Sequence, residues 1–197
     1  MKKSVFLPVI SIVLAALLLF GASAGLNGIA AANAQAEHLR LMQTLLPGSA
    51  AFTVEPYTGE DANIRSVHKG ENGFVIETVT NGYAGEIVML IGVSKEGTVT
   101  GLVVREMQET FGLGANALTD HEFLAQFLNT SGGVAVSTSG ADAFSGATAA
   151  SDDEASTYVD AITGATVTSK AIVRCVNSAV SYVTGADIES GATSWGG

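Results

Sequence analysis

Three near-copies of one short string could each present a threonine hydroxyl for chemistry in the last third of the chain. Each copy reads Asp-x-x-[Ser/Thr]-Gly-Ala-Thr, and the copies end at Thr148, Thr166 and Thr193. A tight turn of small residues exposes the hydroxyl and lets a bulky ligand approach the main chain. Only the middle copy, which begins at Asp160, leads directly into a strongly helical pattern. The sequence therefore favours Thr166 as the residue that carries a group.

The expected chemistry at Thr166 is the attachment of a phosphate. Thr168 or Ser169 can cap the predicted helix, and a helix N-terminus offers unpaired N–H groups with a partial positive charge. These groups would bind a phosphate on the Thr166 oxygen without an arginine cluster. The first copy is instead followed by acidic residues and the third by the end of the sequence, so neither has such a helix.

The N-terminus predicts a membrane anchor. Lys2 and Lys3 precede a stretch from Ser4 to Ala36 without a charged residue, whereas a bilayer core is crossed by roughly 20 apolar residues. The two lysines are expected on the cytoplasmic side of the cell membrane, with the residues from about 37 onward outside the cytoplasm. The alternative is a cleaved signal peptide ending at Ala24 or Ala36. In both interpretations the domain lies outside the cytoplasm.

The remaining pattern predicts an α+β domain with a mostly antiparallel sheet and flanking helices. A helix over 30–46 should end at Pro47-Gly48. A second short helix over 120–127 should have a cap at Asp120 and face Phe123, Leu124 and Phe127 inward. The stretch 129–157 is dominated by small and polar residues and is expected to be a flexible insertion with one short strand near its start. The expected strands are 74–79, 86–94 and 99–105, and the last helix should bury Cys175 on its apolar stripe.

Charge and composition exclude several kinds of partner. The formal net charge of −10 argues against a nucleic-acid partner, because no basic surface is present to neutralise phosphates. A lone cysteine cannot form an internal disulfide or a multi-cysteine metal site. The three histidines are scattered along the chain, so we expect no metal held by protein ligands.

Three strings together resemble a known family. The stretch Asp160-Ala-Ile-Thr-Gly-Ala-Thr-Val-Thr-Ser-Lys-Ala resembles the flavinylation motif of an FMN-binding domain. That domain is shared by the G subunit of the Rnf ion-translocating electron-transport complex and the C subunit of the sodium-pumping NADH:quinone oxidoreductase. Gly82-Tyr83-Ala-Gly85 is similar to a strand entry of the family. Glu109-Thr-Phe-Gly-Leu-Gly114 is similar to its Glu-Thr-Pro-Gly-Leu-Gly loop, with Phe111 in place of proline.

The resemblance implies a covalent flavin. In the family, the last threonine of the motif carries FMN through a phosphoester installed by an ApbE-type flavin transferase, and here that residue is Thr166. Asp160 is expected to position the turn or to assist the transferase. The other residues implied in cofactor binding are Thr163, Gly164, Ala165, Thr168, Ser169, Glu109, Thr110, Gly112, Leu113 and Gly114.

The implied function is electron transfer within a membrane complex. The chain would relay electrons between partner subunits without being a catalyst alone, and its length favours the Rnf-type subunit over the quinone-reductase type. A stand-alone flavinylated carrier and a non-redox, membrane-anchored binding module are the alternatives. The predicted organisation is an anchor over 1–36, a stalk and the start of the domain over 37–81, an FMN-binding domain over 82–184 and a loose tail over 185–197.

Overall fold

The computed structural model describes residues 30–110, 114–137 and 155–186. By compactness the chain divides into two units, Met1–Leu41 and Met42–Gly197. The described part of the first unit is helical, and this helix runs from residue 30 to residue 45, as predicted. Within the described ranges, no helix is long and apolar enough to span a bilayer. The predicted membrane anchor falls mainly on residues 1–29, outside the described residues.

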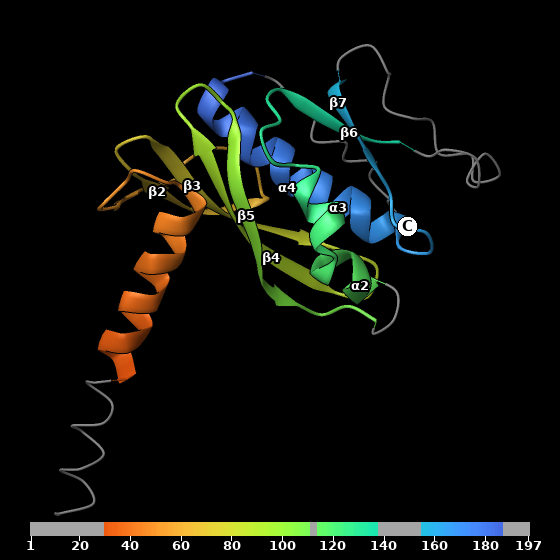
Figure 1. The fold of residues 1–197 in the computed structure, drawn as a ribbon, viewed down its shortest axis with the longest axis horizontal. Coiled ribbons are helices and arrows are strands. Elements are labelled where there is room, and N and C mark those ends of the chain that lie inside the picture. The colour runs from red at the N-terminus through yellow and green to blue at the C-terminus, as the bar shows by residue number, and fades with distance from the viewer. Residues whose placement is uncertain (1–29, 111–113, 138–154, 187–197) are drawn as a thin grey trace, which may run out of the picture. The chain divides into compact units, whose positions relative to one another are not determined.

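The second unit is built on a five-stranded antiparallel sheet in which neighbours in sequence are neighbours in space (Figure 1). Its strands are β1 (Thr53–Glu55), β2 (Ile64–Lys69), β3 (Gly73–Asn81), β4 (Glu86–Ser94) and β5 (Val99–Met107). This confirms the three strands predicted from sequence and the antiparallel α+β class. Strands on both sides of residue 82 share one hydrophobic core, so the predicted segments 37–81 and 82–184 fold together.

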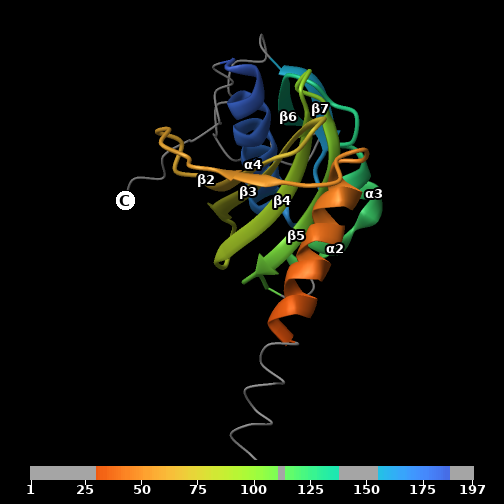
Figure 2. The ribbon, with the colours of Figure 1, turned by 90° about the vertical axis from the view of Figure 1, so that its left-hand side faces the viewer.

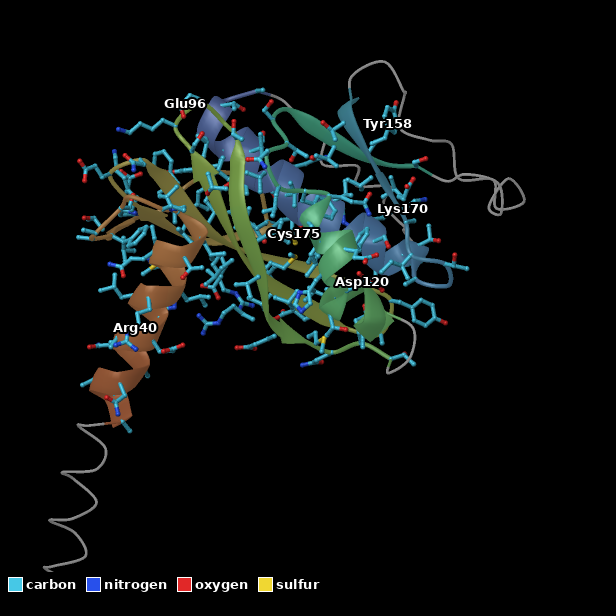
Figure 3. The ribbon with its side chains drawn as sticks, in the orientation of Figure 1. Arg40, Glu96, Asp120, Tyr158, Lys170 and Cys175 are labelled. Carbon is cyan, nitrogen blue, oxygen red and sulfur yellow. The ribbon has the colours of Figure 1, made fainter. Side chains whose placement is uncertain are left out.

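The long helix α4 (Thr166–Thr184) packs along one face of this sheet, against β3 and β4 (Figure 2). Its apolar side is buried, and β4 presents alternate apolar side chains to it. The facing residues include Ile87, Met89, Ile91 and Val93 from β4 and Ile172, Cys175, Val176 and Ala179 from α4. Cys175 lies in this layer (Figure 3), as its place in the apolar stripe predicted.

Two short helices, α2 (Gly114–Thr119) and α3 (His121–Ala125), follow β5. The Asp120 carboxylate caps α3 by accepting the N–H groups of Glu122 and Phe123 at 2.9 and 3.0 Å, as the sequence predicted. Phe123 and Phe127 enter the core with their rings in an edge-to-face arrangement. Leu124, also predicted inward, is only partly buried.

A second, parallel sheet pairs β6 (Gly133–Ser137) with β7 (Ala155–Asp160). The strand near 134–136 was predicted, but β7 was not, so both ends of the segment predicted as a flexible insertion are strands. The Asn177 side chain on α4 fixes β6: its amide accepts from the N–H of Val134 and donates to the carbonyl of Val134, both at 2.9 Å. Residues 138–154 and the predicted tail beyond 186 lie outside the described residues.

Candidate functional site

The middle copy of the repeated string forms a turn between β7 and α4. The N–H of Ala165 donates to the carbonyl of Ile162 at 2.9 Å, and Gly164 has a φ of +80°. A positive φ at the third residue of such a turn is the type II geometry, which glycine adopts without steric cost. The glycine of the motif is therefore a requirement of the backbone, and the turn delivers the chain to the first residue of the helix.

Thr166 is the first helical residue of α4, and Ala165 is the N-cap. The prediction that Thr168 or Ser169 caps the helix was wrong, because the helix begins earlier and both side chains lie inside its first turn. Ser169 instead fastens the turn: its hydroxyl donates to the carbonyl of Ala165 at 3.0 Å and accepts the N–H of Ile162 at 3.3 Å. Both Thr168 and Ser169 are buried.

The start of α4 has the features of an anion site. Ala165 has no side chain that could cap the helix, and the first turn contains no acidic residue. The N–H groups at a helix start have no partners within the helix and carry a partial positive charge. Lys170, one turn after Thr166 and on the same side of the helix, is exposed (Figure 3). This part of α4 thus favours a bound negative group.

The Glu109 carboxylate joins three segments at this place. Its Oε1 atom accepts the N–H of Tyr83 at 2.7 Å and the hydroxyl of Thr168 at 3.3 Å. Its Oε2 atom accepts the N–H of Ala84 at 3.3 Å. The loop between β3 and β4, the end of β5 and the first turn of α4 therefore meet at one side chain. Two of the strings that carried the family resemblance come together with the third.

Two glycines leave the space that this carboxylate occupies. A Cβ atom on Gly82 would overlap Oε1 of Glu109. A Cβ atom on Gly114 would come within 2.5 Å of Oε2 of Glu109 and 2.7 Å of the Thr168 hydroxyl. Gly114, which is predicted to take part in cofactor binding, makes room for Glu109 in the described structure. The geometry assigns Glu109 itself to organising the site.

The other predicted residues fall into two groups. Asp160 is the last residue of β7, and Thr163 and Gly164 are exposed in the turn. Thr110 is exposed, and its carbonyl accepts the N–H of Ala115 at 3.3 Å. The remaining candidates lie outside the described residues: Gly112, Leu113, Thr148 and Thr193, together with Phe111.

Two residues that sequence reasoning missed hold the site in place. The Gln126 side chain, just after α3, accepts the N–H of Asp160 at 2.7 Å. Arg174 donates to the carbonyl of Asn81 at 2.8 Å, next to the loop that contains Tyr83. Arg174 is half-buried, and burial lowers the pKa of its guanidinium. An arginine within an apolar helix was the only sequence signal; nothing in the sequence distinguished Gln126.

The buried thiol of Cys175 is not part of the site. It has no exposed surface, and burial raises its pKa to about 11. A thiol held neutral in this way is a poor nucleophile and metal ligand. The described residues also contain no group of three acidic, histidine or cysteine side chains that could hold a metal ion.

Comparison with known proteins identifies a family model, several relatives and solved structures that are similar to this chain. Residues 82–181 match the model of the FMN-binding domain. The G subunit of an ion-translocating oxidoreductase complex from Methanosarcina acetivorans is 35% identical over 154 residues, which cover 72% of each chain. The G subunit of a proton-translocating ferredoxin:NAD(+) oxidoreductase complex from Clostridium ljungdahlii is 36% identical over 111 residues, or 56% of this chain and 53% of the relative. The crystal structure of NqrC from Shewanella oneidensis is 18% identical with a TM-score of 0.45, covering 74% of this chain and 73% of that one.

Proposed function

This chain belongs to the FMN-binding domain family, and we propose that it carries electrons through an FMN joined to Thr166 by a phosphoester. The observation that carries the proposal is the meeting of three segments around Glu109, directly beside the first turn of α4. Similar relatives are named as the G subunits of ion-translocating oxidoreductase complexes. The proposed role is that of the corresponding component of such a complex.

The residues present fit the phosphate of FMN. Thr166 supplies the oxygen, and the uncapped start of α4, which has no acidic residue in its first turn, favours the negative charge. Lys170 adds a positive charge on the same side of the helix. Gly164 and Ala165 keep bulky side chains away from the attachment point. When attached, FMN supplies one- and two-electron chemistry, while the protein supplies orientation and electrostatics.

Attachment requires a balanced group transfer. The Thr166 oxygen bonds to the flavin phosphorus and the hydroxyl proton is lost. The activated flavin donor, a flavin dinucleotide, gives up its nucleoside monophosphate as the other bond to that phosphorus breaks. The protein holds the acceptor turn through Gln126, which bonds to Asp160 just before it, and through Ser169, which bonds to Ile162 and Ala165 at its two ends. We propose an ApbE-type flavin transferase as the enzyme that performs this step.

The proposal includes a position at the membrane. The uncharged stretch from Ser4 to Ala36 would anchor the chain in the cell membrane, with Lys2 and Lys3 in the cytoplasm and the folded domain outside it. Covalent attachment suits that location, because a dissociated cofactor would be lost from the protein. The partners proposed are the other membrane subunits of the complex.

Mass spectrometry tests the attachment. After co-expression with a flavin transferase, the peptide containing Thr166 should gain the mass of one FMN less one water. Thr166→Val should abolish both this gain and the flavin fluorescence of the protein band in a denaturing gel. Thr148→Val and Thr193→Val are the matched controls and should keep them. An unmodified Thr166 peptide, obtained with a transferase active on another substrate, would overturn the proposal.

A further inference from the structure

We propose that Tyr83 is the aromatic platform for the isoalloxazine ring of the flavin, an inference that rests on the function proposed above. Tyr83 combines a large, exposed side chain with a backbone that is held in place by a hydrogen bond. Its side chain is 71% exposed, the highest value among the large hydrophobic residues that are exposed in the described structure. Its backbone N–H is fixed to Glu109 at 2.7 Å. The ring is therefore exposed to solvent, while the loop backbone beneath it (the base of the ring) is held in place.

Two contacts hold this base against α4. On one side, Oε1 of Glu109 accepts both the Tyr83 N–H and the Thr168 hydroxyl, so these two donors are neighbours across a single oxygen atom. On the other side, Arg174 reaches from α4 to the carbonyl of Asn81, two residues before Tyr83. The loop is closed by a bond from the N–H of Gly82 to the carbonyl of Gly85 at 2.8 Å. The loop that carries Tyr83 is thus held against α4 at Thr168 and at Arg174.

One side of α4 runs from Arg174, which bonds to Asn81, back to the attachment point at Thr166. Val167, Lys170 and Arg174 are spaced three and four residues apart and share one side of α4, which Thr166 borders. Val167 is 49% exposed, and Met107 at the end of β5 is 43% exposed. Val167 and Met107 are thus exposed apolar side chains within two residues in sequence of Thr168 and Glu109, which bond to each other.

The flavin is long enough for its ring to extend from Thr166 to the loop that carries Tyr83. The phosphate and ribityl chain between a threonine oxygen and the ring reaches roughly 10 Å, the rise of about two turns of helix. Tyr83 shares the Oε1 atom of Glu109 with Thr168, two residues after Thr166, so a ring tethered at Thr166 would be able to reach it. Burial of apolar ring surface and an aromatic contact, worth about 0.5–1.5 kcal/mol beyond the area buried, favour that position over solvent. Lys170 and Arg174 place two positive charges on this side of α4.

Flavin fluorescence distinguishes this arrangement. A tyrosine in contact with an excited isoalloxazine ring quenches it by transferring an electron, whereas phenylalanine and leucine are too difficult to oxidise. In the full-length flavinylated protein, Tyr83→Phe and Tyr83→Leu should lengthen the fluorescence lifetime severalfold, and Tyr83→Trp should shorten it. Tyr83→Phe should preserve the visible circular dichroism of the flavin, since the platform remains, while Tyr83→Leu should change it.

The control separates this inference from the proposed function. Tyr158→Phe, at an exposed tyrosine on β7, should leave the lifetime unchanged (Figure 3). Because Tyr83 is exposed, its variants are expected to fold, and circular dichroism in the far ultraviolet checks this. A flavin on Thr166 whose lifetime is the same in the parent protein and in Tyr83→Phe would overturn the inference and leave the proposed function standing. A Thr166 without flavin would overturn both.

Discussion

The carboxylate of Glu109 and the hydroxyl of Thr168 meet at 3.3 Å although 59 residues separate them in the chain. The same carboxylate also accepts two N–H groups from the loop between β3 and β4. One side chain at the end of β5 therefore sets the position of that loop relative to the first turn of α4. The acceptor turn and the Tyr83 loop are placed relative to each other by this side chain more than by either segment's own conformation.

Removing one donor or one acceptor from this cluster should destabilise the domain. Thr168→Val has nearly the same shape but cannot donate, and should lower the free energy of unfolding by about 1 kcal/mol. Glu109→Gln places an amide NH₂ or a single oxygen where two acceptor atoms are needed, and should cost about 1–2 kcal/mol. Urea unfolding followed by circular dichroism measures both. Thr184→Val, which loses only local bonds at the exposed end of α4, to the carbonyl of Val180 and from the N–H of Ala186, is the control and should cost less.

A methyl group on Gly82 should act through Glu109. Gly82→Ala would occupy the position of Oε1, and the flexible Glu109 side chain would have to swing away and lose its bonds. Gly82→Ala and Glu109→Ala therefore remove largely the same interactions. Their effects on the free energy of unfolding should be non-additive, with a coupling of about 1 kcal/mol in a double-mutant cycle. Additive effects would show that Gly82 is needed for some other reason.

Local sequence rules predicted most of the elements, because their physical causes are local. The strand over 86–94 has its predicted bounds, Asp120 caps α3, and Cys175 is buried on the stripe where its spacing placed it. The turn before Thr166 was also predictable, since glycine and small residues favour it. Features that depend on periodicity, or on turn chemistry within a few residues, could be derived from one sequence.

The unpredicted features depend on contacts between distant segments. Strand β7 is short and rich in Ser, Thr and Tyr, and its partner β6 lies before the low-complexity stretch, so its pattern resembled the loop beside it. The caps proposed for Thr168 and Ser169 were wrong because both hydroxyls bond elsewhere: Thr168 to Glu109, and Ser169 to Ala165 and Ile162. No spacing rule connects Gln126 with Asp160 or Arg174 with Asn81.

The Cys175 thiol should make stability depend on pH in the alkaline range. Its pKa rises from 9.0 to about 11 on folding because the side chain is buried. The folded protein therefore keeps a proton that the unfolded chain loses, so this contribution is complete below pH 9.0 and is lost as the pH rises to about 11. The loss should be about 2–3 kcal/mol.

Comparing the parent protein with Cys175→Ala isolates this contribution from other groups that titrate in the same range. The difference in free energy of unfolding between the two proteins should shrink from about pH 8 towards about pH 11, by about the amount given above. The native thiol should also resist iodoacetamide at about pH 8 and react once urea unfolds the protein. Rapid alkylation of the folded protein would contradict the assignment of Cys175 to the core.

The bond from the Asp160 N–H to Gln126 should govern how firmly the acceptor turn is held. At 2.7 Å this bond joins the end of β7 to the residue after α3, and Asp160 opens the turn that leads to Thr166. Gln126→Met matches the side chain in size but offers only a weak sulfur acceptor, whereas Gln126→Glu retains an acceptor oxygen. Hydrogen exchange of the Asp160 amide should therefore accelerate about fivefold in Gln126→Met, the equivalent of about 1 kcal/mol, and stay slow in Gln126→Glu. Because Phe127 and the N-cap Asp120 are unchanged, and the C-cap bonds of Gln126 come from its backbone N–H, the amides of α3 should exchange at the parent rate in both variants. Equal protection of Asp160 in the two variants would show that β7 pairing alone holds the turn.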